Sequence, residues 1–401
     1  MLRRSAPRCT APRSNAQYRT ALCRLHRTAL HAHELADGLF IRFCNSQSGS
    51  KEQGDQLHKE SGLISPCRAW EHGCTCILTR SDTSACVPVL ADTARAVRLT
   101  SACQGVKSVS EVIVMDLNSR VELNNGVSMP LLGLGVFRAH GGEEARSAVR
   151  TALENGYRMI DTARIYCNER SVGRGVRDSM VAREDIFIIT KLWKDDFDNP
   201  RRGLEQSLER LGMDYVDQFL LHWPFKGFEK AWLELEKLCS EGLCRSIGVS
   251  NFKIHHLEEL KEAGASVVPQ VNQVECHPYN HETELINWCR RSNIVVQAYA
   301  PLGGVGNTVL SDPRITTLAD YYKVTPAQLV LRWNMQRGVA VIPKSVRAER
   351  ILENSRVFGF ELSQDDMDVM SDINSNLRRA YDPDKIDQRP AGTFPKIIEE
   401  D

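Results

Sequence analysis

The sequence predicts an α/β fold: a closed (β/α)8 TIM barrel with an amino-terminal β-hairpin, preceded by a largely disordered extension. Eight short apolar segments alternate with helical patterns over about 280 residues. These segments are almost continuously apolar, as are strands buried on both faces of a parallel sheet. Eight such units at this length favour a closed barrel over an open, doubly wound sheet.

The hairpin comes first, with residues 121–123 and 127–130 flanking an Asn-Asn-Gly turn. The strands then follow in chain order. We expect the eight strands at 132–135, 158–163, 186–192, 216–222, 244–250, 269–275, 294–300 and 339–345.

Helical patterns with clear start and stop signals separate these strands. The first helix has apolar residues at i, i+3, i+4, i+7 and i+8, namely Ala145, Ala148, Val149, Ala152 and Leu153. Asn155-Gly156 ends this helix. Asn199-Pro200 and Thr325-Pro326 each place a capping side chain before a proline at the first helical position, and Gly212 closes the helix that Asn199 opens.

An open dinucleotide-binding sheet would need a glycine-rich fingerprint between a strand and a helix. The best match, Gly173-Arg-Gly175, lacks a third glycine and lies inside a helical pattern. We therefore discard that alternative.

Composition excludes two classes of partner. The 401 residues carry 51 basic and 51 acidic side chains, so binding to nucleic acid through bulk positive charge is not expected. No apolar run approaches the roughly 18 residues that a membrane helix needs. We expect neither a nucleic-acid nor a membrane partner.

Residues 1–114 differ from the rest, and we place a boundary between 1–114 and 115–401. Residues 1–33 contain seven arginines and no acidic side chain, a composition typical of an organelle transit peptide. The main alternative is that residues 1–114 are an extension with no folded role, because the segment from Met115 resembles the start of a domain. A third alternative is that residues 1–114 form a folded domain. The cysteines at 67–86 fit no paired zinc-binding spacing, so we expect no metal there.

Titratable residues lie at successive strand ends, where barrel active sites form. Asp161, Lys191 and His222 end the second, third and fourth strands, and Tyr166 lies in the loop after the second. Asp161 is expected to keep Lys191 charged, and this ammonium to lower the pKa of Tyr166. His222 is expected to hydrogen-bond a carbonyl. The set lacks an obvious nucleophile and offers poor ligation for a metal, so we expect no metal and a carbonyl-reducing site beside a bound hydride donor.

Six motifs resemble the aldo-keto reductase superfamily. They lie at 156–169, 187–193, 214–224, 247–252, 272–279 and 342–354. The resemblance implies a barrel that transfers hydride from NADPH to aldehydes and ketones, with Asp161, Tyr166, Lys191 and His222 as the catalytic residues. The short loop after His222 and the short tail are most similar to the branch of 2,5-diketo-gluconate reductases and protist prostaglandin F synthases.

The same resemblance assigns the remaining site residues. It implies cofactor contacts as follows: Ser250, Asn251 and Gln273 at the carboxamide, Tyr299 stacked on the nicotinamide, Leu302 nearby, Lys344, Ser345, Val346 and Arg350 around the 2′-phosphate, and Glu353 and Asn354 toward the adenine. The substrate pocket is expected to be walled by Phe137, Trp193 and Trp223, with His222 at its base.

Two functions remain open from the sequence. The first is an NADPH-dependent carbonyl reductase, a monomer acting on small molecules. The second is an NADPH-binding regulatory or structural protein of the same fold. We expect a cytoplasmic protein, or a mitochondrial or plastid one if residues 1–33 form a transit peptide.

Overall fold

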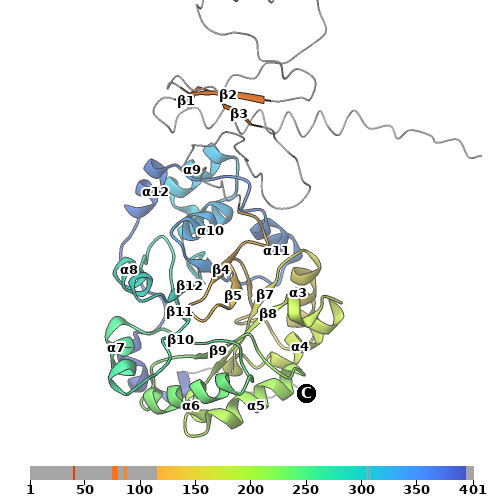
Figure 1. Cartoon of the computed structure of the whole chain (residues 1–401), viewed down its shortest axis with the longest axis vertical. Helices are drawn as coiled ribbons and strands as arrows, with labels where there is room; N and C mark the ends of the chain where they lie inside the picture. The colour runs from red at the N-terminus through yellow and green to blue at the C-terminus, as the bar shows by residue number, and fades with distance from the viewer. Residues whose placement is uncertain are drawn as a thin grey trace, which may run out of the picture. The chain divides into compact units, whose positions relative to one another are not determined.

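A computed structural model describes residues 115–304, 306 and 308–393, together with three short strands nearer the amino terminus (Figure 1). The chain divides into two compact units, Met1–Val114 and Met115–Asp401. In the first unit, β1 (Leu39–Phe40) pairs with β2 (Thr75–Thr79), and β2 pairs with β3 (Ala85–Val87), both antiparallel. The transit peptide predicted at 1–33 lies outside the described residues, so it stays a prediction.

Eight parallel strands form the barrel within residues 115–393, each inside its predicted range. They are β6 (Leu134–Gly135), β7 (Met159–Asp161), β8 (Phe187–Leu192), β9 (Gln218–Leu221), β10 (Ile247–Ser250), β11 (Val271–Glu275), β12 (Val295–Tyr299) and β13 (Ala340–Val341). They lie in sequence order in one sheet. Bridges from Leu132 to Val341 and from Gly135 to Lys344 join the first strand to the last. The predicted barrel is therefore confirmed.

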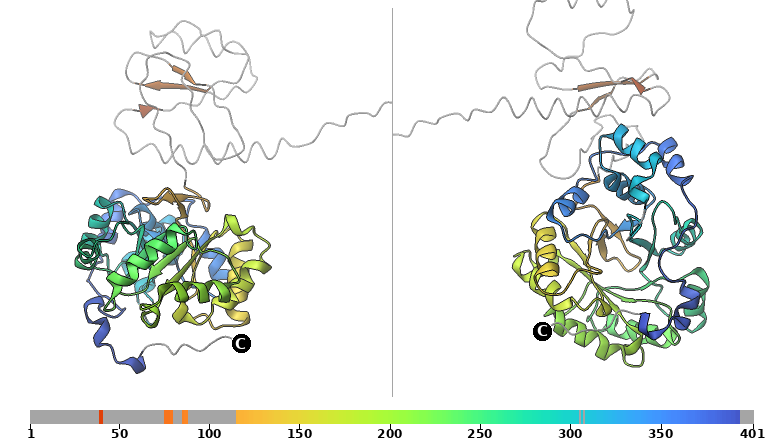
Figure 2. Two further views of the ribbon diagram at one scale, coloured as in Figure 1. Left: turned by 60° about the horizontal axis from the view of Figure 1, so that its bottom comes forward. Right: turned by 180° about the vertical axis from the view of Figure 1, so that it is seen from behind.

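Helices surround the strands, as Figure 2 shows. They are α3 (Glu143–Glu154), α4 (Glu169–Asp178), α5 (Pro200–Leu211), α6 (Phe228–Ser240), α7 (Ile254–Glu262), α8 (Thr283–Arg291), α9 (Pro313–Tyr322), α10 (Pro326–Gln336), α11 (Ala348–Ser355) and α12 (Gln364–Ser371). The buried side chains of α3 are the five apolar residues that its periodicity predicted. Among the described residues, none of the helices is long and apolar enough to cross a membrane.

The predicted start and stop signals operate as expected. The Asn199 side chain accepts a hydrogen bond from the Arg202 N–H at 3.2 Å, and Gly212 ends α5 with a φ of 65°. Thr325 and Gln328 form a reciprocal capping box at the start of α10. Gly173 lies inside α4, where an added Cβ would come within 1.9 Å of the Leu211 carbonyl oxygen. That glycine therefore permits close packing of α4 against α5.

The hairpin of β4 (Arg120–Glu122) and β5 (Ser128–Pro130) covers the amino-terminal end of the barrel. Asn124 Nδ2 donates to the carbonyls of Pro269 and Asn293, which lead into β11 and β12. Met129 packs with the side chains that fill the barrel interior. This end is closed, and the carboxyl ends of the strands are left for a site.

Candidate active site

The structure brings the four predicted catalytic residues together. Asp161 ends β7, Lys191 lies one residue before the end of β8, and His222 directly follows β9. Lys191 Nζ donates to Asp161 Oδ1 at 2.8 Å and to Oδ2 at 2.7 Å, and lies 3.4 Å from Tyr166 Oη. The rings of Tyr166 and His222 meet edge to face, with centroids 5.5 Å apart. We call these four residues the tetrad.

Tyr166 is positioned by a short turn and by a residue that the sequence analysis missed. The 3-10 turn η2 (Arg164–Tyr166) ends at Cys167, whose φ of 56° is left-handed. The buried Asn168 side chain then accepts from Thr162 Oγ1 at 2.8 Å and donates to the carbonyls of Val136 and Ala139. Asn168 thus joins the loop after β6 to the loop of Tyr166. Its place in the same motif as the tyrosine was the only available signal.

Burial determines the electrostatics of the Asp161–Lys191 pair, because both side chains are almost fully removed from solvent. Desolvation lowers the pKa of Lys191, and the neighbouring Asp161 carboxylate opposes that shift. The pKa of Asp161 is raised by desolvation and drawn back by Lys191 and Gln273. Lys191 Nζ also donates to the Thr162 carbonyl at 2.8 Å, so the buried ammonium is fully hydrogen-bonded.

The expectation that the pKa of Tyr166 is lowered is wrong in this structure. Burial raises the pKa of Tyr166 well above its ordinary value, and Asp161 and Tyr299 add to the rise. The physical reason is that the Lys191 charge is already shared between two oxygens of Asp161, while the phenol is fully buried. Tyr166 is therefore a protonated phenol at neutral pH, suited to give a proton.

His222 is neutral for the same reason. Burial, followed by the charge of Lys191, lowers the pKa of His222 well below its ordinary value. Its Nδ1 atom is buried without a hydrogen-bond partner among the described residues. A buried polar atom of this kind indicates a site completed by a bound molecule.

The residues predicted at the carboxamide form one connected network. Tyr299 Oη donates to Asn251 Oδ1 at 2.6 Å, Asn251 Nδ2 donates to Ser250 Oγ at 3.1 Å, and Ser250 Oγ donates to the Gln273 carbonyl at 2.9 Å. Gln273 Nε2 donates to Asp161 Oδ2 and to Gln297 Oε1, each at 2.7 Å. Gln273 therefore also orients a member of the tetrad, which the sequence analysis did not anticipate.

The residues predicted at the 2′-phosphate lie in the loop before α11 and in its first turn, which contains Arg350. Lys344 and Arg350 are exposed, and the Ser345 hydroxyl accepts from the Arg347 N–H at 3.1 Å. Arg347, the residue before α11, adds an exposed cation that the prediction missed. Two further residues of the predicted cofactor site are less exposed: Asn354 is buried and Val346 is partly buried.

Glu353 Oε1 accepts from the hydroxyl of Thr325, the N-cap residue of α10, at 2.6 Å. Its predicted contact with the adenine stays a prediction.

Aromatic side chains border the tetrad. Phe137 is 42% exposed and contacts the Tyr166 ring at a centroid distance of 5.0 Å. Trp193 meets His222 at 5.3 Å, and Phe225, which was not predicted, meets Trp193 at 5.2 Å. Trp223 is buried directly after His222.

Leu302, predicted near the cofactor, is partly buried against the core. The loop between β9 and α6 is short, as expected.

Comparisons with known proteins agree with this geometry. Residues 131–375 match the model of the Aldo/keto reductase family. The chain is 45% identical over 273 residues to a glyoxal reductase of Bacillus subtilis (strain 168), covering 67% of this chain and 98% of that protein. It is 42% identical over 269 residues to the methylglyoxal reductase DkgA of Escherichia coli (strain K12), covering 66% and 97%.

A solved structure gives the same result. The aldo-keto reductase MGS-M4 from a Medee basin deep-sea metagenome library is 41% identical, with a TM-score of 0.65 and coverage of 67% of this chain and 99% of that one. The barrel, the buried tetrad and the extent of these matches all point to one family. The chain belongs to the aldo/keto reductase family, whose members are oxidoreductases that generally use a nicotinamide cofactor.

Proposed function

We propose that the protein reduces small carbonyl compounds, aldehydes and α-dicarbonyls above all, to alcohols with NADPH. The observation that carries this proposal is the buried Lys191 ammonium, held by Asp161 and placed 3.4 Å from the Tyr166 hydroxyl. That arrangement supplies a proton and stabilises the anion left behind.

The residues present fit NADPH. His222 Nδ1 is a buried polar atom without a protein partner, and the hydroxyl of Tyr299 is fixed by Asn251. Exposed Lys344, in the loop before α11, and exposed Arg350, in its first turn, offer cations to a 2′-phosphate. The residues that would hold the cofactor are Ser250, Asn251, Gln273, Tyr299, Leu302, Lys344, Ser345, Val346, Arg350, Glu353 and Asn354. When bound, NADPH supplies the hydride for the carbonyl carbon.

The tetrad then provides the proton. Tyr166, protonated because its pKa is raised, donates its phenolic proton to the carbonyl oxygen. Lys191 stabilises the tyrosinate that forms, and Asp161 keeps the ammonium in place. His222, neutral at pH 7, donates a hydrogen bond to the same oxygen and orients the substrate.

The surroundings of the tetrad favour small substrates. Phe137 and Trp193 place apolar side chains beside the tetrad, and the loop between β9 and α6 is short. The two relatives described above are named for glyoxal and methylglyoxal reduction. We expect broad activity on α-dicarbonyls, aromatic aldehydes and keto-sugars, because an apolar pocket discriminates by only about 1–3 kcal/mol per methylene.

The test is NADPH oxidation with methylglyoxal, an aromatic aldehyde and a rigid steroid ketone. Tyr166→Phe should lower kcat by about 10²–10⁴-fold while NADPH still binds, because only the proton donor is removed. Tyr321→Phe, a change on the exposed surface of α9, is the matched control and should leave kcat unchanged. NADPH binding by the wild type without turnover of any aldehyde would instead support the regulatory or structural alternative.

A further inference from the structure

The carboxyl-terminal segment, residues 378–388, contacts three loops at the carboxyl-end face of the barrel. The Ala380 N–H donates to Glu275 at the end of β11, at 2.6 Å. Lys253, just before α7, donates to Asp382 at 2.8 Å, and Asp387 accepts from the Lys226 N–H in the loop after β9 at 3.1 Å. Nothing in the proposed reaction uses the side chains at the middle of this segment.

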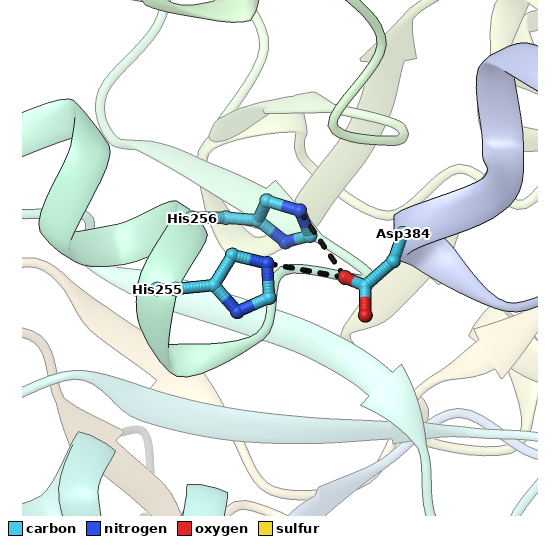
Figure 3. A group of neighbouring side chains, drawn as sticks. All are labelled: His255, His256 and Asp384. Atoms are coloured by element: carbon cyan, nitrogen blue, oxygen red, sulfur yellow. Dashed lines mark ion pairs between the residues drawn. The ribbon is translucent and has the colours of Figure 1, made fainter.

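Two histidines and a carboxylate converge at that middle point. His255 and His256 lie in the first turn of α7, and Asp384 lies in the 3-10 helix η6 (Pro383–Gln388). Figure 3 shows both rings turned toward the same carboxylate across the gap between the two elements. Asp384 Oδ1 lies 3.1 Å from His255 Nε2 and 3.5 Å from His256 Nε2. The three ligand atoms lie within 4.8 Å of one another.

We propose that His255, His256 and Asp384 form a zinc site that fastens the carboxyl-terminal segment to α7. Zinc binds histidine nitrogen and carboxylate oxygen at about 2.0–2.2 Å in a tetrahedral arrangement. Two ligands of one tetrahedral ion are then separated by roughly 3.3 Å. The two nitrogen-to-oxygen distances in this cluster lie on either side of that value, and the two histidine nitrogens lie within 4.8 Å of each other.

A hydrogen bond from a neighbouring lysine holds the Asp384 carboxylate. Asp384 Oδ2 accepts from Lys253 Nζ at 2.7 Å, which leaves Oδ1 for the metal and fixes the plane of the carboxylate. Such outer hydrogen bonds orient metal ligands.

An ion has a route to this point. His255 has half of its side chain exposed and borders an open cavity of about 510 Å³ between the starts of α7 and α8. Water from that side would supply the fourth ligand, as in zinc sites that keep an open position.

Coordination has a defined structural consequence. His256 Nδ1 accepts the Lys253 N–H at 3.1 Å, so without metal the ring proton is on Nε2. Zinc at Nε2 moves that proton to Nδ1, and the capping hydrogen bond to Lys253 is lost. Zinc binding is therefore expected to secure η6 while loosening the first turn of α7.

The experiment is a calorimetric titration of the full-length protein with Zn²⁺. Eight of the thirteen cysteines lie in residues 1–114, so the readout is the number of sites lost in each variant. The wild type should bind one Zn²⁺ more than His255→Gln or Asp384→Asn, because either variant leaves only two of the three protein ligands that an open zinc site uses. His140→Gln, which removes an exposed histidine away from the cluster, should bind as the wild type does. Equal numbers of sites in all four proteins would overturn the proposal.

Hydrogen exchange gives a second, independent reading. Zn²⁺ should slow exchange of the amides in η6 and speed exchange of the Lys253 amide in the wild type, and do neither in His255→Gln. Mg²⁺, which prefers oxygen ligands, should have no effect. Unchanged exchange in η6 of the wild type with Zn²⁺ would count against the site whatever the calorimetry shows.

Discussion

Burial sets the protonation states of two tetrad residues, because it raises the pKa of Tyr166 and lowers the pKa of His222. The four residue types and their strand ends follow from the sequence, so the site itself was predictable. The direction of the Tyr166 pKa shift could not be predicted from the sequence. It depends on how fully the phenol is removed from water and on how strongly Asp161 binds the Lys191 ammonium. Both are properties of packing.

A pH profile tests the resulting assignment. Alcohol oxidation, the reverse reaction, needs Tyr166 without its proton, and burial raises the pKa of this phenol. The oxidation kcat should therefore rise by up to about ten-fold per unit between pH 6 and pH 9, whereas the reduction kcat stays nearly flat. The measurement is kcat at saturating cofactor in both directions. An oxidation rate that levels off near pH 7 would show that the acid has a lowered pKa.

A second prediction at this scale concerns cofactor choice. Arg350 is exposed in the first turn of α11, and exposed Lys344 lies three residues before the N-cap Arg347. A cation near a helix amino terminus is disfavoured by the helix dipole unless an anion binds there. Lys344→Met or Arg350→Met should raise the NADPH Kd about 10- to 100-fold, the value of one charge-assisted hydrogen bond, and leave NADH binding unchanged.

Quenching of protein fluorescence by each cofactor provides the affinities. Arg356→Met, at the other end of α11, is the matched control and should behave as the wild type. Equal losses for NADPH and NADH would show that Lys344 and Arg350 support the fold and do not recognise a phosphate.

At the scale of elements, local signals were sufficient to place strands and helices but not to set their ends. The predicted strand 339–345 contains only β13 (Ala340–Val341), because Pro343 cannot donate to a ladder. The segment 244–250 contributes β10 from Ile247 onward, with only an isolated bridge at Cys244. An apolar run indicates burial, whereas a strand end depends on where the neighbouring strand stops pairing.

One helix start provides an element-scale prediction. Asp312 caps α9 by accepting from the Arg314 N–H at 2.9 Å, and also bonds the Arg314 guanidinium and the Tyr279 hydroxyl. The hydrogen bond from Arg314 lowers the pKa of Asp312 to about 2. Because this pKa is depressed in the folded state, the stabilisation is fully present above the unfolded value of about 3.9 and is lost as pH falls through about 2.

Asp312→Asn keeps a capping side chain but removes the charge. We expect it to lower the free energy of unfolding by about 1–2 kcal/mol at pH 7, a figure reduced from the full shift because Arg314 is half exposed. Urea unfolding at pH 7 and pH 3 is the measurement, and the difference should shrink at pH 3. Asp320→Asn on the same helix is the control, expected within about 0.5 kcal/mol of the wild type. A loss that is equal at both pH values would assign the effect to something other than the ion pair.

At the scale of the whole molecule, the contacts that sequence reasoning missed join segments far apart in the chain. Gln273 orients Asp161 across 112 residues, and His255 and Asp384 meet although 129 positions separate them. Barrel topology predicts that strand ends converge, so the tetrad and the residues of the carboxamide network could be placed together from the sequence. It does not predict where a tail after the last strand will lie, and the histidine cluster therefore depends entirely on the structure.

The last prediction concerns residues 1–114. The unit Met115–Asp401 contains all eight barrel strands, the hairpin that covers their amino-terminal end, and the whole tetrad. The glyoxal reductase of Bacillus subtilis is matched over 98% of its length by 67% of this chain, so a protein of this family needs no counterpart of the remaining third. A truncated protein of residues 115–401 should therefore unfold in a single cooperative step and keep kcat/KM within about two-fold of the full chain. Thermal unfolding and the methylglyoxal assay measure both properties. Aggregation or a large loss of activity would show that residues 1–114 belong to the folded enzyme.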